Sequence, residues 1–335
     1  MLTSLQTKYC YMKPQQQFFK KRPYPVILFC LLTFSSVFSQ TGHQHFLLRD
    51  EGLSQLSYID LGDSTKNWYQ PIPTGRDLQL IGNNRVLIGT DNGYEERDIA
   101  TGKKLYELAS FPGTISARRL SNGNTVLVGL NWQGKEGIVL VEVNNNASVQ
   151  RLIVYPGFKY ARLVRETVAG TFLITANDLA FEGNLSGNVL WKAKITSNRD
   201  PHCWQALRLS NGQTVVSSGY AGNIQVFAKD GSLLKTISGP DAVKPNFYAG
   251  LQILPNGNYV VINWEGHGKT HGDTGTQLLE YTPDGKLVWS WQQSSAHFSS
   301  LHAVIILDGL DTNQLHIEDA NGVLKPVKLV KFGLE

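Results

Sequence analysis

Apolar and polar residues alternate along much of this chain, in short runs that are each interrupted by a turn sequence. The clearest runs are SARRLSNGNTVLVG (116–129), QALRLSNGQTVVSSG (205–219) and AGLQILPNGNYVVINW (249–264). Alternation with a period of two is typical of half-buried β-strands, and Asn-Gly accepts the positive φ that a tight hairpin turn needs. Each run therefore predicts a β-hairpin, and looser copies lie at 76–89 and 160–176.

A second hairpin follows most of these copies, with Thr-Gly or Asp-Gly at its turn. Examples are the segments 96–108, 224–237 and 278–291. Two hairpins give a unit of four strands, A to D, and the units recur every 40–50 residues or so, which is the spacing of β-propeller blades. No long segment shows the 3.6-residue period of a helix.

The segment 299–309 resembles a sixth A strand, so we expect an all-β fold with a single β-propeller of six four-stranded blades. A count of seven blades is the alternative. The sixth A strand lacks partners after it, whereas 45–52, 55–61 and 66–72 read as three further strands. We therefore expect N- and C-terminal strands to share one blade and close the ring, which leaves no open sheet edge. The tail, 314–327, either adds a strand or packs beneath the ring.

The N-terminal segment has the pattern of a secretory signal peptide. Lys20, Lys21 and Arg22 precede an apolar run at 26–34, and a cleavage sequence, SSVFSQ, follows it. We interpret 1–39 as the signal and 40–335 as the propeller domain, exported to the periplasm or beyond the cell. The apolar run is too short to span a bilayer, so we expect no membrane span in the mature chain.

Charge and cysteine content change once this segment is set aside. The chain has 31 basic and 27 acidic residues, and five of the basic ones but no acidic ones lie in 1–39, which leaves 26 against 27. This balance argues against a nucleic-acid partner, which would need a strongly basic face. Only Cys203 of the three cysteines remains, and we interpret it as a small buried apolar residue.

Two short sequences carry a family resemblance. DGKLVW (284–289) resembles the blade ends of quinoprotein-like (PQQ-like) propellers, and LQILPNGNYVVINWEGHG (251–268) is similar to bacterial arylsulfotransferase propellers. The quinoprotein dehydrogenases of the first group imply more blades, a quinone in the channel and a vicinal disulfide. With one cysteine in the mature chain, we expect no bound quinone and no other cofactor. The sulfotransferases carry histidines before such strands, whereas 246–250 here reads NFYAG.

The loops divide between the two faces of the expected ring. Because strand direction alternates, the A–B and C–D turns lie on one face and the B–C loops and D–A linkers on the other. The second face receives the longer connections, including NWEGHGKTHGDTG (263–275), and its linkers lead into the innermost strands at the channel mouth. The predicted ligand-binding residues there are Arg76, Asp77, Arg118, Tyr160, Arg162, Trp204, Asn246, Phe247, Tyr248, Trp264, His267, His271 and His302.

These residue types favour a binding site. Arginine holds carboxylate, phosphate or sulfate, and aromatic rings stack on sugars or other rings. We predict a binding or scaffolding propeller for an anionic or sugar-like small molecule, or for an envelope protein. The alternative is a sulfotransferase-like or lyase-like enzyme that uses His302, His202 or His267.

Each candidate also has an alternative without ligand chemistry. His267 and His271 are a weak metal pair, because a glycine-rich loop does not orient two imidazoles as a helix does. Arg118, Arg162 and Arg208 are equally suited to ion pairs between blades.

Overall fold

The structure, a computed structural model, describes residues 42–327 and has six four-stranded antiparallel blades arranged as a β-propeller. The first blade contains β24 (Leu301–Ile306), β1 (His45–Asp50), β2 (Gln55–Asp60) and β3 (Trp68–Pro71). The second contains β4 (Leu78–Gly82), β5 (Arg85–Thr90), β6 (Gly93–Asp98) and β7 (Lys104–Leu108). The third contains β8 (Ser116–Arg119), β9 (Thr125–Leu130), β10 (Ile138–Val143) and β11 (Val149–Tyr155). The fourth contains β12 (Val164–Glu166), β13 (Phe172–Ala176), β14 (Leu179–Gly183) and β15 (Val189–Lys194). The fifth contains β16 (Gln205–Arg208), β17 (Thr214–Ser217), β18 (Asn223–Phe227) and β19 (Leu233–Ser238). The sixth contains β20 (Phe247–Ile253), β21 (Tyr259–Trp264), β22 (Leu278–Tyr281) and β23 (Leu287–Trp291).

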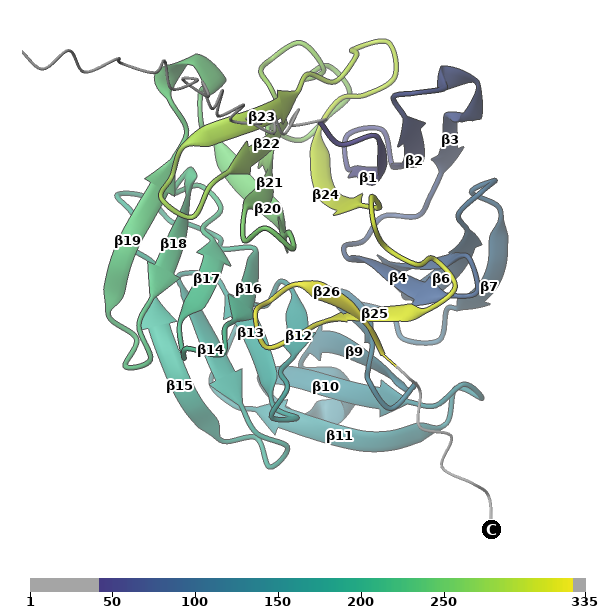
Figure 1. Cartoon of the computed structure of the whole chain (residues 1–335). Coiled ribbons are helices and arrows are strands. Elements are labelled where there is room, and N and C mark those ends of the chain that lie inside the picture. The colour runs from purple at the N-terminus through teal and green to yellow at the C-terminus, as the bar shows by residue number, and fades with distance from the viewer. Residues whose placement is uncertain (1–41, 328–335) are drawn as a thin grey trace, which may run out of the picture. The chain divides into compact units, whose positions relative to one another are not determined.

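The ring closes through both ends of the described chain, as the sequence predicts. Strand β24 forms the inner edge of one blade and pairs antiparallel with β1, with Phe46 opposite Ile306 and Leu48 opposite Val304. The blade order is β24, β1, β2, β3, so its innermost strand comes from the far end of the sequence. Figure 1 shows the yellow β24 beside the dark β1. The six-blade count is confirmed.

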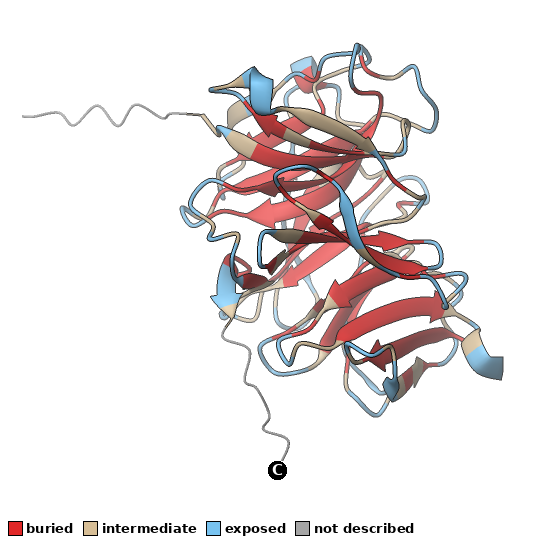
Figure 2. Ribbon diagram, turned by 90° about the vertical axis from the view of Figure 1, so that its right-hand side faces the viewer, coloured by how far each residue is buried: buried red, intermediate tan, exposed pale blue. Residues whose placement is uncertain are grey.

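Hydrophobic packing between blades explains which strands are buried. The described residues form six clusters, and each cluster contains residues of at least two blades. A middle strand such as β10 is buried at every position, whereas the outermost strand β19 is buried only at Ile237. Figure 2 shows the same contrast, with buried strand interiors and exposed outer loops. Cys203 is a free, buried cysteine in one of these clusters, which confirms its interpretation as an apolar residue.

The repeated Asn-Gly turns have a common local cause. The Oδ1 atom of Asn122 accepts a hydrogen bond from the backbone N–H of Asn124 at 2.9 Å, and Asn211 does the same for Gln213 at 2.9 Å. Gly123 follows with a φ of 88°, a conformation that glycine adopts without a Cβ penalty. The side-chain bond and the glycine together fix a short turn, so the A–B turns add little surface to their face.

The tail forms an additional hairpin, β25 (Leu315–Glu318) and β26 (Leu324–Val327), inside the ring. Strand β25 joins the inner edge of β4, with Leu315 opposite Ile81. The backbone N–H of Asn83, in an A–B turn, donates to the carbonyl of Asn313 at 3.1 Å. The hairpin therefore covers the centre of the A–B face, where Figure 1 shows it in yellow. The opposite face keeps an open mouth.

The predicted signal peptide, 1–39, lies outside the described residues. Within 42–327 the only helical segments are short 3-10 turns: η1 (Ser64–Lys66), η2 (Trp132–Gly134) and η3 (Asp241–Val243). None of the helices in this part of the chain is long and apolar enough to cross a membrane.

Candidate functional site at the channel mouth

A cavity of about 300 Å³ opens at the centre of the face that carries the B–C loops and D–A linkers. All six blades contribute to it. Its lining residues are Glu51, Thr74, Gly75, Arg76, Asp91, Thr114, Arg162, His202, Trp204, Tyr220, Phe247, Trp264, His267 and His302. The glycine-rich loop 263–275 therefore does share a face with the linkers, because it supplies His267 to this cavity.

Two arginines in the cavity wall have no carboxylate partner in the described part of the chain. The guanidinium carbons of Arg76 and Arg162 lie 5.9 Å and 5.3 Å from the ring centre of Trp204. Arg162 also lies 4.8 Å from the ring of Tyr160. Burial, assisted by the charge of Arg162, lowers the pKa of Arg76 to about 10, and burial also lowers the pKa of Arg162. Both groups still carry a positive charge at neutral pH.

His302 lies at the start of β24 and is 2% exposed, yet neither of its ring nitrogens has a hydrogen-bond partner in the described residues. Its ring centre lies 5.6 Å from that of Trp204. Burial is the main cause that holds the pKa of His302 well below 6.5, and the charges of Arg49, Arg76 and Arg162 act in the same direction. The imidazole is therefore neutral at neutral pH and faces the cavity with unused polar atoms.

Arg49, on β1, is a third cation close to the mouth, and it supports the linker that carries Arg76. Its guanidinium donates only to main-chain carbonyls: those of Gly89 at 2.7 Å, Pro73 at 3.0 Å and Asp77 at 3.2 Å. It is 1% exposed, and burial lowers its pKa to about 9. Arg49 therefore adds positive potential at the site without reaching the cavity itself.

Aromatic rings form the other wall of the cavity. Phe247 lies at the centre of this group, with its ring 5.7 Å from Trp204, 5.1 Å from Trp264 and 4.7 Å from Tyr220. At the rim, the indole N–H of Trp264 donates to Glu51 at 3.4 Å, and His267 Nδ1 lies 2.9 Å from the same carboxylate. The hydrogen-bonding groups at this end are thus already engaged with one another.

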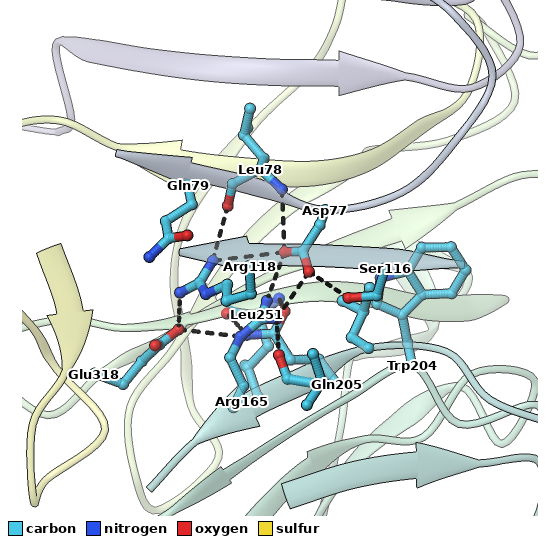
Figure 3. Close-up of polar contacts among 12 residues, drawn as sticks. Asp77, Leu78, Gln79, Ser116, Arg118, Arg165, Trp204, Gln205, Leu251 and Glu318 are labelled. Carbon is cyan, nitrogen blue, oxygen red and sulfur yellow. Dashed lines mark hydrogen bonds and ion pairs between the residues drawn. The ribbon is translucent and has the colours of Figure 1, made fainter. Parts of the chain in front are cut away.

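A second cluster of charges lies below the cavity, inside the channel (Figure 3). Asp77 accepts from Ser116 at 2.7 Å and from Arg165 at 3.2 Å, and it lies 3.5 Å from Arg118. Glu318 from the tail completes the cluster, at 2.6 Å from Arg118 and 3.1 Å from Arg165. The remaining enclosed space is about 30 Å³. We call Asp77, Arg118, Arg165 and Glu318 the floor cluster.

The electrostatics of the floor cluster are balanced. Burial alone would raise the pKa of Glu318, but the neighbouring Arg118 and Arg165 charges hold it below its usual value. Burial lowers the pKa of Arg118, and the two carboxylates partly restore it. The cluster contains two acids and two bases, so its charges balance and it has no excess charge to offer an ionic ligand. Two of its buried atoms, Arg165 Nε and Glu318 Oε2, have no hydrogen-bond partner in the described residues.

The structure brings together eight of the residues predicted from the sequence. Those that line the cavity are Arg76, Arg162, His202, Trp204, Phe247, Trp264, His267 and His302. Asp77 and Arg118 lie instead in the floor cluster, because each points down the channel from the innermost strands. Arg208 pairs with Glu182 at 2.7 Å, so two of the three arginines that were open to ion pairs do form them, and Arg162 does not.

The predicted residues Tyr160, Tyr248 and Asn246 do not line the cavity and make structural contacts next to it. The hydroxyl of Tyr160 lies 2.7 Å from His202 Nδ1, and the Tyr248 hydroxyl lies 2.7 Å from that of Tyr281. Asn246 donates to the carbonyl of Trp264 at 3.2 Å. These contacts hold the linkers in place behind the cavity wall.

His267 and His271 do not converge on a common point. His271 Nε2 lies 2.9 Å from the main-chain carbonyl of His267, whereas the imidazole of His267 is directed at Glu51. Among residues 42–327 there is no group of three or more side chains that could hold a metal ion. Metal binding by His267 and His271 stays a prediction, which metal analysis of the purified protein would test.

The sequence argument missed the cavity residues that come from short B–C loops, together with three residues of the D–A linkers. The missed residues are Glu51, Thr74, Gly75, Asp91, Thr114 and Tyr220. Glu51 and Tyr220 follow strands β1 and β17 at their mouth-facing ends. The alternation of strand direction assigns them to this face, but only the ring geometry shows that they reach its centre.

Several solved β-propellers are similar to this fold. A protein of unknown function from Bacteroides caccae has a TM-score of 0.62 and 20% identity, over 78% of this chain and 98% of that chain. A catalytically inactive histidine-to-alanine virginiamycin B lyase from Staphylococcus aureus, with quinupristin, has a TM-score of 0.50 and 11% identity, over 83% and 89%. Calcium-binding regucalcin from Agrobacterium tumefaciens has a TM-score of 0.50 and 16% identity, over 75% of this chain and 86% of that chain.

At these identities the likeness shows the β-propeller fold alone. No protein-family model and no curated protein sequence matches the chain. The propeller that the internal repeat predicts is confirmed. The quinoprotein-like resemblance, the arylsulfotransferase-like resemblance and the absence of a bound quinone stay predictions.

Proposed function

We propose that this propeller is an exported binding protein that takes a small organic anion at the channel mouth. The observation that carries the proposal is a concentration of unused polar atoms. Of the eleven buried side-chain nitrogen and oxygen atoms without a partner in the described residues, four belong to the cavity-lining Arg162, Trp204 and His302. All four atoms are nitrogens, and each can donate a hydrogen bond in at least one protonation or tautomeric state, which suits a ligand rich in acceptors.

The charge distribution supports an anion over a neutral sugar. Arg76 and Arg162 bring two positive charges to the wall. Of the two acids in the lining, Glu51 is engaged by His267 and Trp264, and the exposed Asp91 accepts from Asn92 at 3.0 Å. Even a partly buried cation such as Arg76 or Arg162 is costly without a counter-ion, and a bound carboxylate, phosphate or sulfate would reduce this cost. A sugar needs acceptors as well as donors for its hydroxyl groups, whereas the unpartnered buried side-chain atoms of the lining are all nitrogens.

A thermal-shift comparison tests the binding of an anion. We expect acetate, benzoate, sulfate and glucuronate at millimolar concentration to raise the melting temperature of the parent more than glucose or benzamide does, since a ligand stabilises the state it binds. The variant Arg76→Met combined with Arg162→Met should lose this response. Arg151→Met, on the outer strand β11, is the matched control and should keep it. Equal shifts for glucose and glucuronate would contradict the proposal.

A second candidate is a lyase-like or sulfotransferase-like enzyme, and His302 is the observation that favours it. A neutral, buried imidazole beside Arg76 and Arg162 suits the removal of a proton from a carbon next to a bound carboxylate, with the arginines stabilising the resulting negative charge. The likeness to virginiamycin B lyase is one of fold and adds no residue to this argument.

Proton exchange separates the enzyme from the binding protein. In D₂O, the parent should catalyse exchange of the α-protons of phenylacetate, observed by NMR, and His302→Asn should not. Binding of phenylacetate without any proton exchange would agree with the proposed binding function and would exclude His302 as a base for this class of acid.

A further inference from the structure

The mouth cavity has two chemically different halves that meet at Trp204. On one side, Arg76 and Arg162 lie over the indole, at 5.9 Å and 5.3 Å from its centre, and His302 lies 5.6 Å away. On the other side, the Phe247 ring is 5.7 Å from Trp204. A ligand that crosses Trp204 therefore leaves a cationic region and enters an aromatic one.

The aromatic half consists of ring faces and edges at steep angles to one another. Phe247 meets Trp264 at 67° and Tyr220 at 83°, both in edge-to-face arrangements. Phe247 and Trp264 belong to the largest group of core residues around the channel, and Tyr220 packs against it. These rings hold one another in position, so the wall is prepared for a flat apolar body before any ligand arrives.

The hydrogen-bonding groups at the far end of this wall are already engaged. Glu51 lies 2.9 Å from the imidazole of His267 and accepts from the indole of Trp264 at 3.4 Å. Apart from the Tyr220 hydroxyl, the aromatic half therefore presents carbon to the ligand, while the unpartnered buried nitrogens belong to Arg162 and His302 in the cationic half and to Trp204 at the boundary. A polyhydroxylated body placed there would lose hydration without replacement.

We propose that the ligand is a planar aromatic acid, with its anionic group between Arg76, Arg162 and His302 and its ring against Phe247, Tyr220 and Trp264. This inference rests on the proposed binding of an anion and adds the chemical class of the ligand. A cavity of about 300 Å³ lies at the lower end of the range for small-molecule sites, which suits an acid with one or two rings.

A comparison of matched acids tests the aromatic requirement separately from the charge. Ligand-observed NMR or calorimetry would measure the parent with benzoate and naphthoate, with their saturated counterparts cyclohexanecarboxylate and decalin carboxylate, and with the neutral benzamide. Aromatic contacts contribute beyond the apolar area that they bury, so the aromatic acids should bind roughly 2- to 10-fold more tightly than the saturated acids. Benzamide should bind at least 10-fold more weakly than benzoate.

Two variants should affect the two halves differently. Tyr220→Leu removes a ring from the aromatic half and should reduce the preference for benzoate over cyclohexanecarboxylate, while both acids still bind. Arg76→Met removes charge and should weaken both acids alike. Arg151→Met serves again as the control and should change neither affinity.

The outcomes distinguish this inference from the proposed function. Equal affinity for the aromatic and saturated acids would overturn the aromatic class and leave the anion site intact. Benzamide binding as tightly as benzoate would overturn the anion site. If neither acid of a pair binds at millimolar concentration, both proposals are wrong.

Discussion

The mouth and the floor of the same channel use arginine in opposite ways. In the floor cluster, Arg118 lies 2.6 Å from Glu318 and Arg165 lies 3.2 Å from Asp77, so each cation has a buried carboxylate. In the mouth, Arg76 and Arg162 have aromatic neighbours but no acid partner in the described residues. Arg76 directly precedes Asp77, and Arg162 lies three residues before Arg165. The charges of the floor cluster are nevertheless balanced, whereas the two arginines at the mouth have no counter-ion in the described residues.

This difference separates a structural role from a binding role. Satisfied buried charges rigidify a fold but are expensive to disturb, because removal of one partner leaves the other uncompensated. Unpaired cations in a cavity cost stability in the free protein and recover that cost when an anion binds. The stability of a variant should therefore respond in opposite directions at the two sites, and the predictions below follow from this contrast.

The largest effect is expected in the floor cluster. Asp77→Asn keeps the left-handed backbone conformation, with φ of 76°, that asparagine also adopts readily. It removes the carboxylate that Arg118 and Arg165 share, so we expect a loss of about 3–5 kcal/mol in the free energy of unfolding. Chemical denaturation measures this loss. Asp230→Asn, in an exposed C–D turn, is the control and should leave the midpoint unchanged. If Asp77→Asn has nearly the same free energy of unfolding as the parent, the side chains of the floor cluster do not depend on one another's charges.

At the mouth, the effect of a substitution on the free energy of unfolding should have the opposite sign. Arg76→Met keeps most of the apolar stem and removes a cation that has no counter-ion, so we expect the free energy of unfolding to stay level or rise by about 1–3 kcal/mol. The same variant should lose at least 10-fold in affinity for benzoate. A destabilisation as large as that of Asp77→Asn would mean that Arg76 is a structural residue and would contradict the distinction drawn above.

The sequence predicts the ring itself much better than it predicts this division of roles. The repeat of A–B and C–D turns, the six A strands and the shared closing blade follow from local patterns, since each Asn-Gly turn is fixed by its own residues. Arg118 and Arg162 look alike in sequence. Their roles differ because Glu318, a residue of the unassigned tail, reaches Arg118 and does not reach Arg162.

Long-range contacts explain the other gaps in the sequence argument. Arg49 sits on β1, whose place next to the mouth depends on closure of the ring by β24. Glu51 and Tyr220 reach the cavity only because six blades converge on one axis. Local periodicity assigns a residue to a face of the ring, but the distance to the axis depends on the whole fold.

Acid should destabilise the protein through His302 in particular. Its pKa in the folded state lies well below 6.5, so the unfolded state binds more protons as the pH falls below about 6.5. The stabilising effect of the neutral imidazole is therefore complete above pH 6.5 or so and is lost on acidification, with a slope of up to about 1.4 kcal/mol per pH unit.

Unfolding experiments between pH 7 and 5 on the parent and on His302→Gln would isolate this slope. His316 contributes in the same direction in both proteins, because burial also lowers its pKa, so the difference between the two curves belongs to His302. Saturation with benzoate should make the loss smaller, because the anion offsets the charges of Arg76 and Arg162. Parallel curves for the two proteins would show that His302 is not kept neutral by its surroundings.

The smallest effect is expected at the rim, where His267 is 80% exposed. Its contact with Glu51 is a surface pair, and such pairs contribute about 0–1 kcal/mol, so His267→Ala should leave stability nearly unchanged. It frees the carboxylate of Glu51, whose negative charge then faces the cavity with one partner fewer, so benzoate should bind slightly more weakly. Equilibrium dialysis against zinc adds a second test of the same residue. Zinc bound by the parent and lost in His267→Ala would make the rim a metal site after all, and would require His271 to leave the carbonyl group that it contacts.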